Sequence, residues 1–150
     1  MPLEENLAAV RRLLDAWNSH DLDRIGPFFH EDFVNHQLPF PAVVGRDAYL
    51  AHCAHWFTAY PDFRMEAVSL FGQGELVCLE TRGGGTRRDG FFGTGPSGRA
   101  EVNCAVDVLE FRDGLIAVER GYWDFSVYTG EPAPMAGGHR DPASPFFAAG

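Results

Sequence analysis

The spacing of apolar residues changes once along this chain, from helical steps to the alternation of strands. Near the start, apolar positions recur at every third or fourth residue and form one stripe: Leu3, Leu7, Val10, Leu14 and Trp17. This period predicts an amphipathic helix over residues 4–19. A short second helix is expected over residues 22–29, then a short strand over 32–36 and a loop over 37–45 that contains prolines and a glycine.

A third helix is predicted over residues 47–59. One of its faces combines aromatic residues with a cysteine: Tyr49, Cys53, Trp56 and Tyr60. Pro61 ends this helix, because a proline disfavours helical geometry in the residue before it.

After Pro61 the chain alternates between apolar and polar positions, and β-branched and aromatic residues become frequent. Strands are expected from residue 63, over 76–81, over 99–111 and over 115–128. Short glycine-containing turns at 72–74 and 112–114 suit hairpins, and the glycines at 83–85 suit a kink or bulge. Helices followed by hairpin-linked strands predict an α+β domain with helices on one face of an antiparallel sheet.

Composition places this pattern in a single domain. The chain has 150 residues, of which 45% are hydrophobic and 22% charged, enough to form one core. We expect the domain to span residues 1–130 and the Pro-, Ala- and Gly-rich residues 131–150 to form a tail. Its three cysteines, far apart and odd in number, indicate reduced core residues rather than disulfides.

The net charge of the chain limits the classes of binding partner that are expected. Twelve basic and 21 acidic residues give a net charge of -9, which disfavours nucleic acid because phosphates would be repelled. No apolar run approaches the roughly 20 residues of a membrane span, and no signal peptide is apparent, so a cytoplasmic protein without a membrane partner is expected.

Two local motifs are weak. Residues 93–98 fit the dinucleotide pattern G-x-G-x-x-G, but strand rather than helix is predicted to follow, and Pro96 lacks an N–H for a phosphate. His52 and His55 lie three residues apart on the third helix, without an HExxH-type pattern. We therefore expect neither a nucleotide nor a metal site.

The last predicted strand carries the candidate chemistry. Strict alternation places Arg120, Tyr122 and Asp124 on one face. If the hairpin at 113–114 is tight, Asp107 of the preceding strand lies near Arg120. This favours either a structural Asp107–Arg120 ion pair or a functional site among aromatic side chains.

Asp124 has two interpretations. It is either a surface carboxylate near a strand end or a carboxylate turned into an apolar pocket, where desolvation would raise its pKa and suit it to act as a general base. His36 either donates to a substrate oxygen or hydrogen-bonds the backbone.

Several motifs, in this order, resemble the SnoaL-like polyketide cyclase family of the nuclear transport factor 2-like, cystatin-like superfamily. They are Phe33-Val34-Asn35-His36, Ala59-Tyr60-Pro61-Asp62-Phe63, Gly85-Thr86, Phe92-Gly93, Pro96-Ser97-Gly98-Arg99, Asp107-Val108, Asp113-Gly114 and Gly121-Tyr122-Trp123-Asp124. The resemblance spans about residues 7–124. It implies a cone-shaped α+β barrel in which helices close a curved antiparallel or mixed sheet around a pocket, and often a homodimer.

The resemblance also implies a cofactor-independent cyclase or isomerase acting on a small hydrophobic or aromatic, polyketide-like carbonyl compound. Family cyclases use neither metal nor cofactor, and their pocket aspartate, matched here by Asp124, removes a proton from carbon before an intramolecular aldol closure. The candidate catalytic residues are Asp124, His36, Asp107 and Arg120. The candidate substrate-binding residues are Trp17, Trp56, Tyr60, Asn103, Tyr122 and Arg87, with His36, Asn103 and Tyr122 as possible donors to an oxyanion.

The sequence differs from the family pattern at two places. Arg87 follows Gly-Thr where the family often has His, and Val118-Glu119-Arg120 replaces Glu-His-Trp. Asp107, Arg120 and Asp124 loosely resemble the Asp-Arg-Asp arrangement of limonene-epoxide-hydrolase-like members, which activate water. A hydrolase or hydratase and a non-catalytic small-ligand-binding module therefore remain alternatives.

Overall fold

The structure is a computed structural model that describes residues 2–37, 40–91, 93–124 and 127. The expected tail, residues 131–150, lies outside the described residues. Three helices and a short 3-10 turn occupy the first part of the chain: α1 (Pro2–Ser19), α2 (Leu22–Ile25), the turn Gly26–Phe28, and α3 (Arg46–Ala59).

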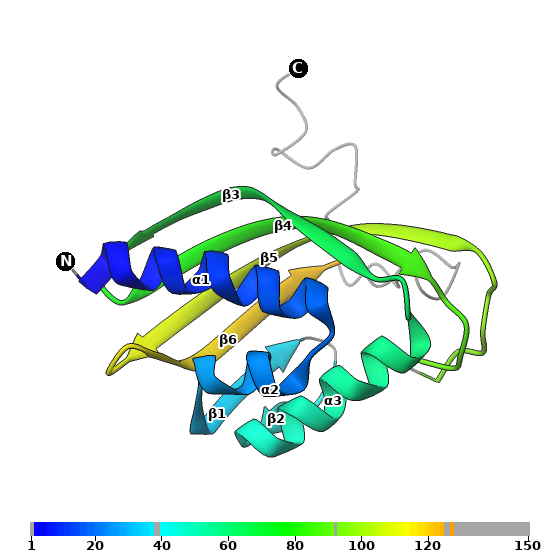
Figure 1. The fold of residues 1–150 in the computed structure, drawn as a ribbon, viewed down its shortest axis with the longest axis horizontal. Coiled ribbons are helices and arrows are strands. Elements are labelled where there is room, and N and C mark those ends of the chain that lie inside the picture. The colour runs from blue at the N-terminus through cyan, green and yellow to red at the C-terminus, as the bar shows by residue number, and fades with distance from the viewer. Residues whose placement is uncertain (1, 38–39, 92, 125–126, 128–150) are drawn as a thin grey trace, which may run out of the picture.

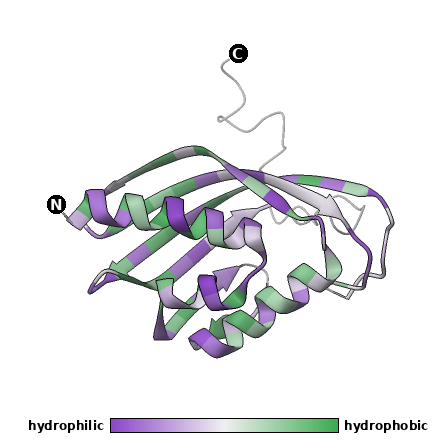
Figure 2. Ribbon diagram, in the orientation of Figure 1, coloured by the Kyte–Doolittle hydropathy of each residue, from purple (hydrophilic) through white to green (hydrophobic). Residues whose placement is uncertain are grey.

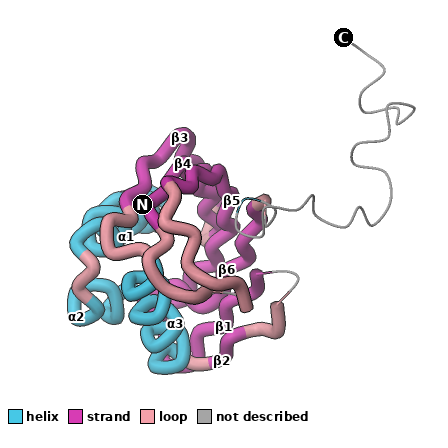
Figure 3. The backbone as a smooth tube through the Cα atoms, turned by 90° about the vertical axis from the view of Figure 1, so that its right-hand side faces the viewer, coloured by secondary structure: helices cyan, strands magenta, loops and turns pink. Residues whose placement is uncertain are grey.

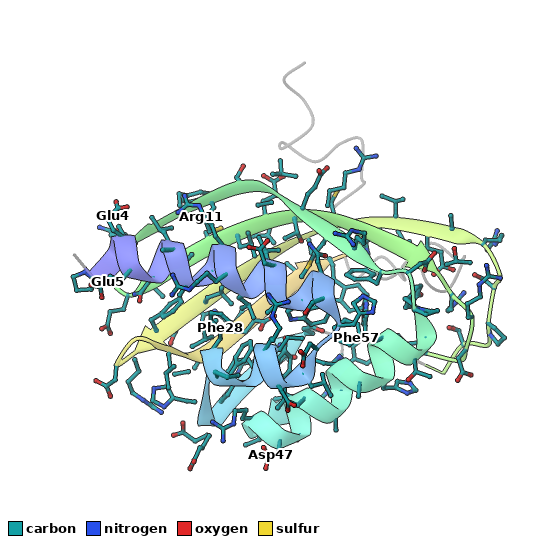
Figure 4. The ribbon with its side chains drawn as sticks, viewed as in Figure 1. Glu4, Glu5, Arg11, Phe28, Asp47 and Phe57 are labelled. Atoms are coloured by element: carbon teal, nitrogen blue, oxygen red, sulfur yellow. The ribbon has the colours of Figure 1, made fainter. Side chains whose placement is uncertain are left out.

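The helices form where the apolar period predicts them. In α1, the acidic Glu4 and Glu5 extend into solvent from the first turn (Figure 4), where they complement the positive end of the helix dipole. The expected second helix is divided, because α2 ends at Ile25 and a separate 3-10 turn, Gly26–Phe28, follows with Pro27 in its first positions.

Six strands follow the order β2-β1-β6-β5-β4-β3 in one sheet. Their bounds are β1 (Phe29–Gln37), β2 (Val43–Val44), β3 (Arg64–Gln73), β4 (Leu76–Thr86), β5 (Ala100–Arg112) and β6 (Leu115–Trp123). β1 pairs with β6 in parallel and the other pairs are antiparallel, so the sheet is mixed. Among the described residues, β2 and β3 form its two edges, so the sheet is open. The expected α+β fold, with helices on a curved mixed sheet, is confirmed, and only the expectation of a closed barrel is corrected.

The helices cover one face of this sheet (Figures 1 and 3). α1 packs against β3 and β4, while α3 packs against β1. Apolar and polar segments alternate along the strands (Figure 2), as expected when only one face is covered. Phe29, Phe33 and Tyr49 pack together in the core with ring centroids 4.6–4.9 Å apart.

The three glycines at 83–85 lie inside β4 and do not end it. A Cβ on Gly83 would lie 2.7 Å from the Met65 Cβ, and one on Gly84 would lie 2.2 Å from the Glu101 carbonyl oxygen. These glycines therefore let β3 and β5 approach β4 closely. Among the described residues, no helix is long and apolar enough to cross a membrane.

Candidate functional site

A bulge in β6 decides which side chains enter the site. Next to the turn at 113–114, Phe111 pairs with Ile116, but Glu110 pairs with Val118. One extra residue, Ala117, is thus inserted into β6. Beyond the bulge every partner is displaced by one position.

Because of this shift, Asp107 pairs with Gly121 instead of Arg120. Arg120 lies on the outer face of the sheet, where it forms an ion pair with Glu110. The predicted Asp107–Arg120 ion pair is therefore wrong, and Asp107, Arg120 and Asp124 do not assemble an Asp-Arg-Asp site. A slip of one residue exchanges the two faces of a strand, which explains the error.

A cavity of about 120 Å³ lies between the inner face of the sheet and the helices α1 and α3. Its walls are mostly apolar and aromatic. They are lined by Leu13, Leu14, Trp17, Gln37, Tyr49, His52, Trp56, Phe63, Met65, Leu79, Thr81, Gly83, Asn103, Ala105, Asp107, Leu109, Glu119 and Trp123. Among the described residues, the lining contains two carboxyl groups and neither lysine nor arginine.

These two carboxyl groups, Asp107 and Glu119, lie on neighbouring strands and share a hydrogen bond. Burial raises the pKa of Asp107 to about 7, although the hydrogen bond from Glu119 opposes that rise. Burial, reinforced by the charge of Asp107, raises the pKa of Glu119 well above its ordinary value. Glu119 therefore keeps its proton and donates it in the hydrogen bond to Asp107.

Two further polar residues contact this pair. Asn35 pairs with Glu119 across β1 and β6 and is 2% exposed, and its side chain lowers the Glu119 pKa. Tyr49 of α3 is buried beside the carboxyl groups. Burial, followed by the nearby Cys53 thiol and the two carboxyl groups, raises the pKa of the Tyr49 hydroxyl. The tyrosine therefore remains neutral, and its hydroxyl donates a hydrogen bond to the Cys53 sulfur.

Four of the residues predicted from the sequence lie on the cavity wall: Trp17, Trp56, Asn103 and Asp107. Trp17 comes from α1, Trp56 from α3, and the other two from β5. The Asn103 amide donates to the Asp124 carbonyl oxygen at 2.9 Å, and its side-chain oxygen accepts from the Cys104 N–H at 2.9 Å.

Three other predicted residues lie outside that wall. Asp124 follows the end of β6 and is exposed, so the expectation that it turns into an enclosed pocket is wrong in geometry. His36 is exposed on β1, and Tyr122 is 55% exposed on the outer face of β6. The bulge in β6 turns Tyr122 to the outer face. His36 also lies on the outer face, because it follows the inward-facing Asn35 on β1.

Arg87 and Tyr60, both predicted to bind substrate, instead belong to a buried network next to the loop between β4 and β5. Arg87 forms a 3.0 Å ion pair with Glu101, and both side chains are 6% exposed. The Tyr60 hydroxyl donates to Glu101 at 2.6 Å, and the Ser97 hydroxyl does so at 2.9 Å. This loop contains the glycine-rich residues 93–98, so that motif connects two strands, as expected.

The polar lining residues that sequence reasoning missed include Gln37, Tyr49 and Glu119. Gln37 was assigned to the loop after the predicted strand 32–36, but β1 continues through it, and there it alternates in phase with the apolar Phe33. Glu119 could not be found, since the single-residue bulge has no clear signature in the sequence. Tyr49 was placed correctly on the apolar face of its helix but was not considered as a donor.

His52 also lines the cavity, and burial, with a smaller effect of the neighbouring His55, lowers its pKa. This histidine is therefore neutral near pH 7. Among the described residues, no three His, Cys, Asp or Glu side chains are grouped so that they could hold a metal ion.

Comparisons with known proteins agree on one family. A sequence model of the SnoaL-like polyketide cyclase family matches residues 7–128. The aklanonic acid methyl ester cyclase AcmA of Streptomyces galilaeus is 28% identical over 146 residues, which cover 93% of this chain and 100% of that protein.

Solved structures show the same fold. A protein of Jannaschia sp. CCS1, assigned as a SnoaL-like polyketide cyclase, superposes with a TM-score of 0.79 at 24% identity, covering 88% of this chain and 94% of that one. An LEH-like epoxide hydrolase of M. tuberculosis superposes with a TM-score of 0.71 at 18% identity, covering 87% and 91%. The fold is therefore shared by proteins with different named activities.

Proposed function

Because the chain belongs to the SnoaL-like polyketide cyclase family, we propose that it closes a ring in a small carbonyl compound with Asp107 as the general base. The observation that carries this proposal is the hydrogen-bonded pair of Asp107 and Glu119 in a mostly apolar cavity. A carboxylate with a pKa of about 7 is present in useful amounts at neutral pH and is basic enough to accept a proton from carbon.

The reaction needs neither metal nor cofactor. The Asp107 carboxylate removes a proton from the carbon next to a carbonyl group, so the C–H bond breaks and an enolate forms. The enolate carbon attacks a second carbonyl carbon of the same molecule and forms the new C–C bond. The resulting alkoxide then takes the proton back from Asp107. The cavity contributes by holding both carbonyl groups close together.

The walls define the substrate class. Trp17, Trp56, Phe63 and Trp123 supply flat apolar surfaces, which suit a hydrophobic or aromatic carbonyl compound. The name of AcmA makes aklanonic acid methyl ester a reasonable first compound to test. Nucleic acid and membranes are not among the partners that we propose.

Substitution of Asp107 tests the proposal. We expect Asp107→Asn to lower kcat for cyclisation by at least 100-fold, because an amide cannot accept the proton, while the fold remains intact by circular dichroism. Asp124→Asn is the matched variant, since it changes the carboxylate that the family resemblance indicates. A large loss in Asp124→Asn, with near-normal turnover in Asp107→Asn, would return the base role to Asp124.

Activation of water is the second candidate, because a carboxylate–carboxylic acid pair can also deprotonate a water molecule. It would use Asp107 and Glu119, since Arg120 lies on the outer face. Oxygen-18 from labelled water in the product would support hydrolysis or hydration. Ligand recovered unchanged, with equal affinity in wild type and Asp107→Asn, would instead indicate a binding module.

A further inference from the structure

A row of three residues crosses the inner face of the sheet next to the carboxyl pair. Gln37 of β1 pairs with Gly121 of β6, and Gly121 pairs with Asp107 of β5. The central member has no side chain. Gln37 and Asp107 therefore face each other across a gap that any other residue would fill.

The contacts around Gly121 show how narrow this gap is. A Cβ placed on Gly121 would lie 2.9 Å from Asp107 Oδ1, 3.0 Å from Gln37 Cγ and 3.1 Å from Gln37 Nε2. A proton-accepting oxygen and an amide nitrogen thus approach the same point above the β6 backbone. Both residues also line the cavity.

The Gln37 amide is available for a ligand in a way that the other amides are not. Within the described part of the chain, its side chain makes no hydrogen bond of ordinary geometry. By contrast, both functional atoms of the Asn103 amide are engaged with backbone groups. Asn35 lies beside Glu119, and its amide nitrogen has no hydrogen-bond partner among the described residues, but it is not part of the cavity wall.

We infer that the Gln37 side-chain amide donates a hydrogen bond to the substrate oxygen on which negative charge develops when Asp107 removes the proton. This inference rests on the proposed function and assigns Gln37 as a further catalytic residue. A carbonyl oxygen and the hydrogen on its neighbouring carbon lie close together in any substrate. An acceptor and a donor on either side of Gly121 match that arrangement.

The amide keeps its protons throughout. As the C–H bond breaks, the charge moves to the carbonyl oxygen, and the Gln37 N–H bond dipole stabilises it. When the enolate carbon forms the new C–C bond, the charge leaves that oxygen. A fixed dipole in a mostly apolar cavity is effective here, because it needs little reorganisation during the reaction.

Turnover by glutamine variants tests the role. We expect Gln37→Met, which keeps the length but removes the N–H, to lower kcat roughly 100-fold with a smaller change in KM, as for loss of one oxyanion donor. The chain has one other glutamine, Gln73, which is exposed at the end of β3. Gln73→Met is therefore the control and should match wild type in kcat and thermal stability.

Gly121→Ala is a second variant. Its methyl group would displace Asp107 or Gln37, so we expect a comparable loss of kcat from a folded protein. Unchanged kcat in Gln37→Met would overturn the assignment, even if Asp107→Asn confirms the base. If Asp107→Asn retains turnover, the proposed function fails. The role of Gln37 is then tested by NMR of its side-chain amide.

A readout without turnover comes from selective labelling of glutamine side-chain amides with nitrogen-15. Two amide groups are labelled, Gln37 and the internal control Gln73. 2-Naphthol, a flat mimic of an enol, is added to the wild-type protein, with naphthalene as the apolar control. We expect 2-naphthol to shift the Gln37 amide protons downfield, naphthalene to leave them nearly unmoved, and Gln73 to respond to neither.

Each result of the 2-naphthol experiment either supports or overturns the hydrogen bond from Gln37. A Gln37 shift with 2-naphthol alone supports the hydrogen bond. A change in tryptophan fluorescence without a Gln37 shift overturns it, because the probe then occupies the cavity without using the amide. No response of either kind also counts against the inference, since a site that stabilises an enolate oxygen should bind such a mimic.

Discussion

At the residue scale, burial makes Asp107 and Glu119 bind protons more tightly in the folded chain than in the unfolded one. Burial is the main cause of the raised pKa of both groups. Between their ordinary pKa values near 4 and the folded value of about 7 for Asp107, the folded state holds more protons than the unfolded state. The free energy of unfolding contributed by these groups therefore falls as pH rises through this window.

This sign gives a measurable prediction. We expect Asp107→Asn to be more stable than wild type at pH 8, by about 2 kcal/mol, since one pKa unit corresponds to about 1.4 kcal/mol and the cavity is partly open to water. Near pH 4 the two proteins should differ little. Thermal melts between pH 4 and pH 8 measure the difference.

Asp15→Asn is the control for that experiment, because Asp15 is exposed on α1. Its melting temperature should follow the wild-type pH dependence throughout. Parallel curves for wild type and Asp107→Asn would show that Asp107 does not titrate differently in the two states. Stability gained together with activity lost would be the usual exchange at a catalytic site.

At the element scale, two features shape the cavity. The extra residue in β6 exchanges the faces of the strand and brings Glu119 inside and Arg120 outside. The loop between β4 and β5 is held by the buried Arg87–Glu101 pair, while Phe91 of the same loop packs against Trp56 with ring centroids 4.8 Å apart. The loop thereby closes over a helix that forms part of the cavity wall.

We predict that Arg87→Met destabilises the protein by about 3 kcal/mol. The substitution would leave Glu101 buried without its cation, and an uncompensated buried charge is costly. Arg88→Met is the matched control, because this neighbouring arginine is exposed. Urea unfolding of both variants measures the effect, and equal midpoints would contradict a structural role for the buried pair.

At the scale of the whole molecule, the helices of the described residues cover only the inner face of the sheet. The outer face exposes large apolar side chains, including Phe71, Val102 and Tyr122. Exposed apolar surface of this kind favours association. We propose that a second copy of the chain covers it, in keeping with the homodimer expected from the sequence.

Light scattering coupled to gel filtration tests the dimer. We expect wild type to elute as a dimer of the 16.6 kDa chain and Val102→Glu to shift towards monomer, because a carboxylate on the outer face is costly to bury. Ala51→Glu, on the exposed side of α3, should not change the mass. A monomeric wild-type protein would rule the proposal out.

The sequence by itself determined the class and order of the elements. The three-to-four period of α1 and the alternation after Pro61 depend on neighbours along the chain, so they can be read locally. The same holds for the apolar faces of Trp17 and Trp56, and for the family, whose motifs recur in order. Asp107 was also identified as a candidate, although with the wrong partner.

Only the tertiary structure decided which polar groups meet. Strict alternation places Arg120 opposite Asp107, but one inserted residue at Ala117 replaces it with Gly121 and turns Glu119 inward. Whether a strand bulges depends on its packing against neighbouring strands and helices, which the local pattern does not record. For the same reason, the gap above Gly121 that lets Gln37 and Asp107 face each other exists only once three strands from distant parts of the chain are aligned.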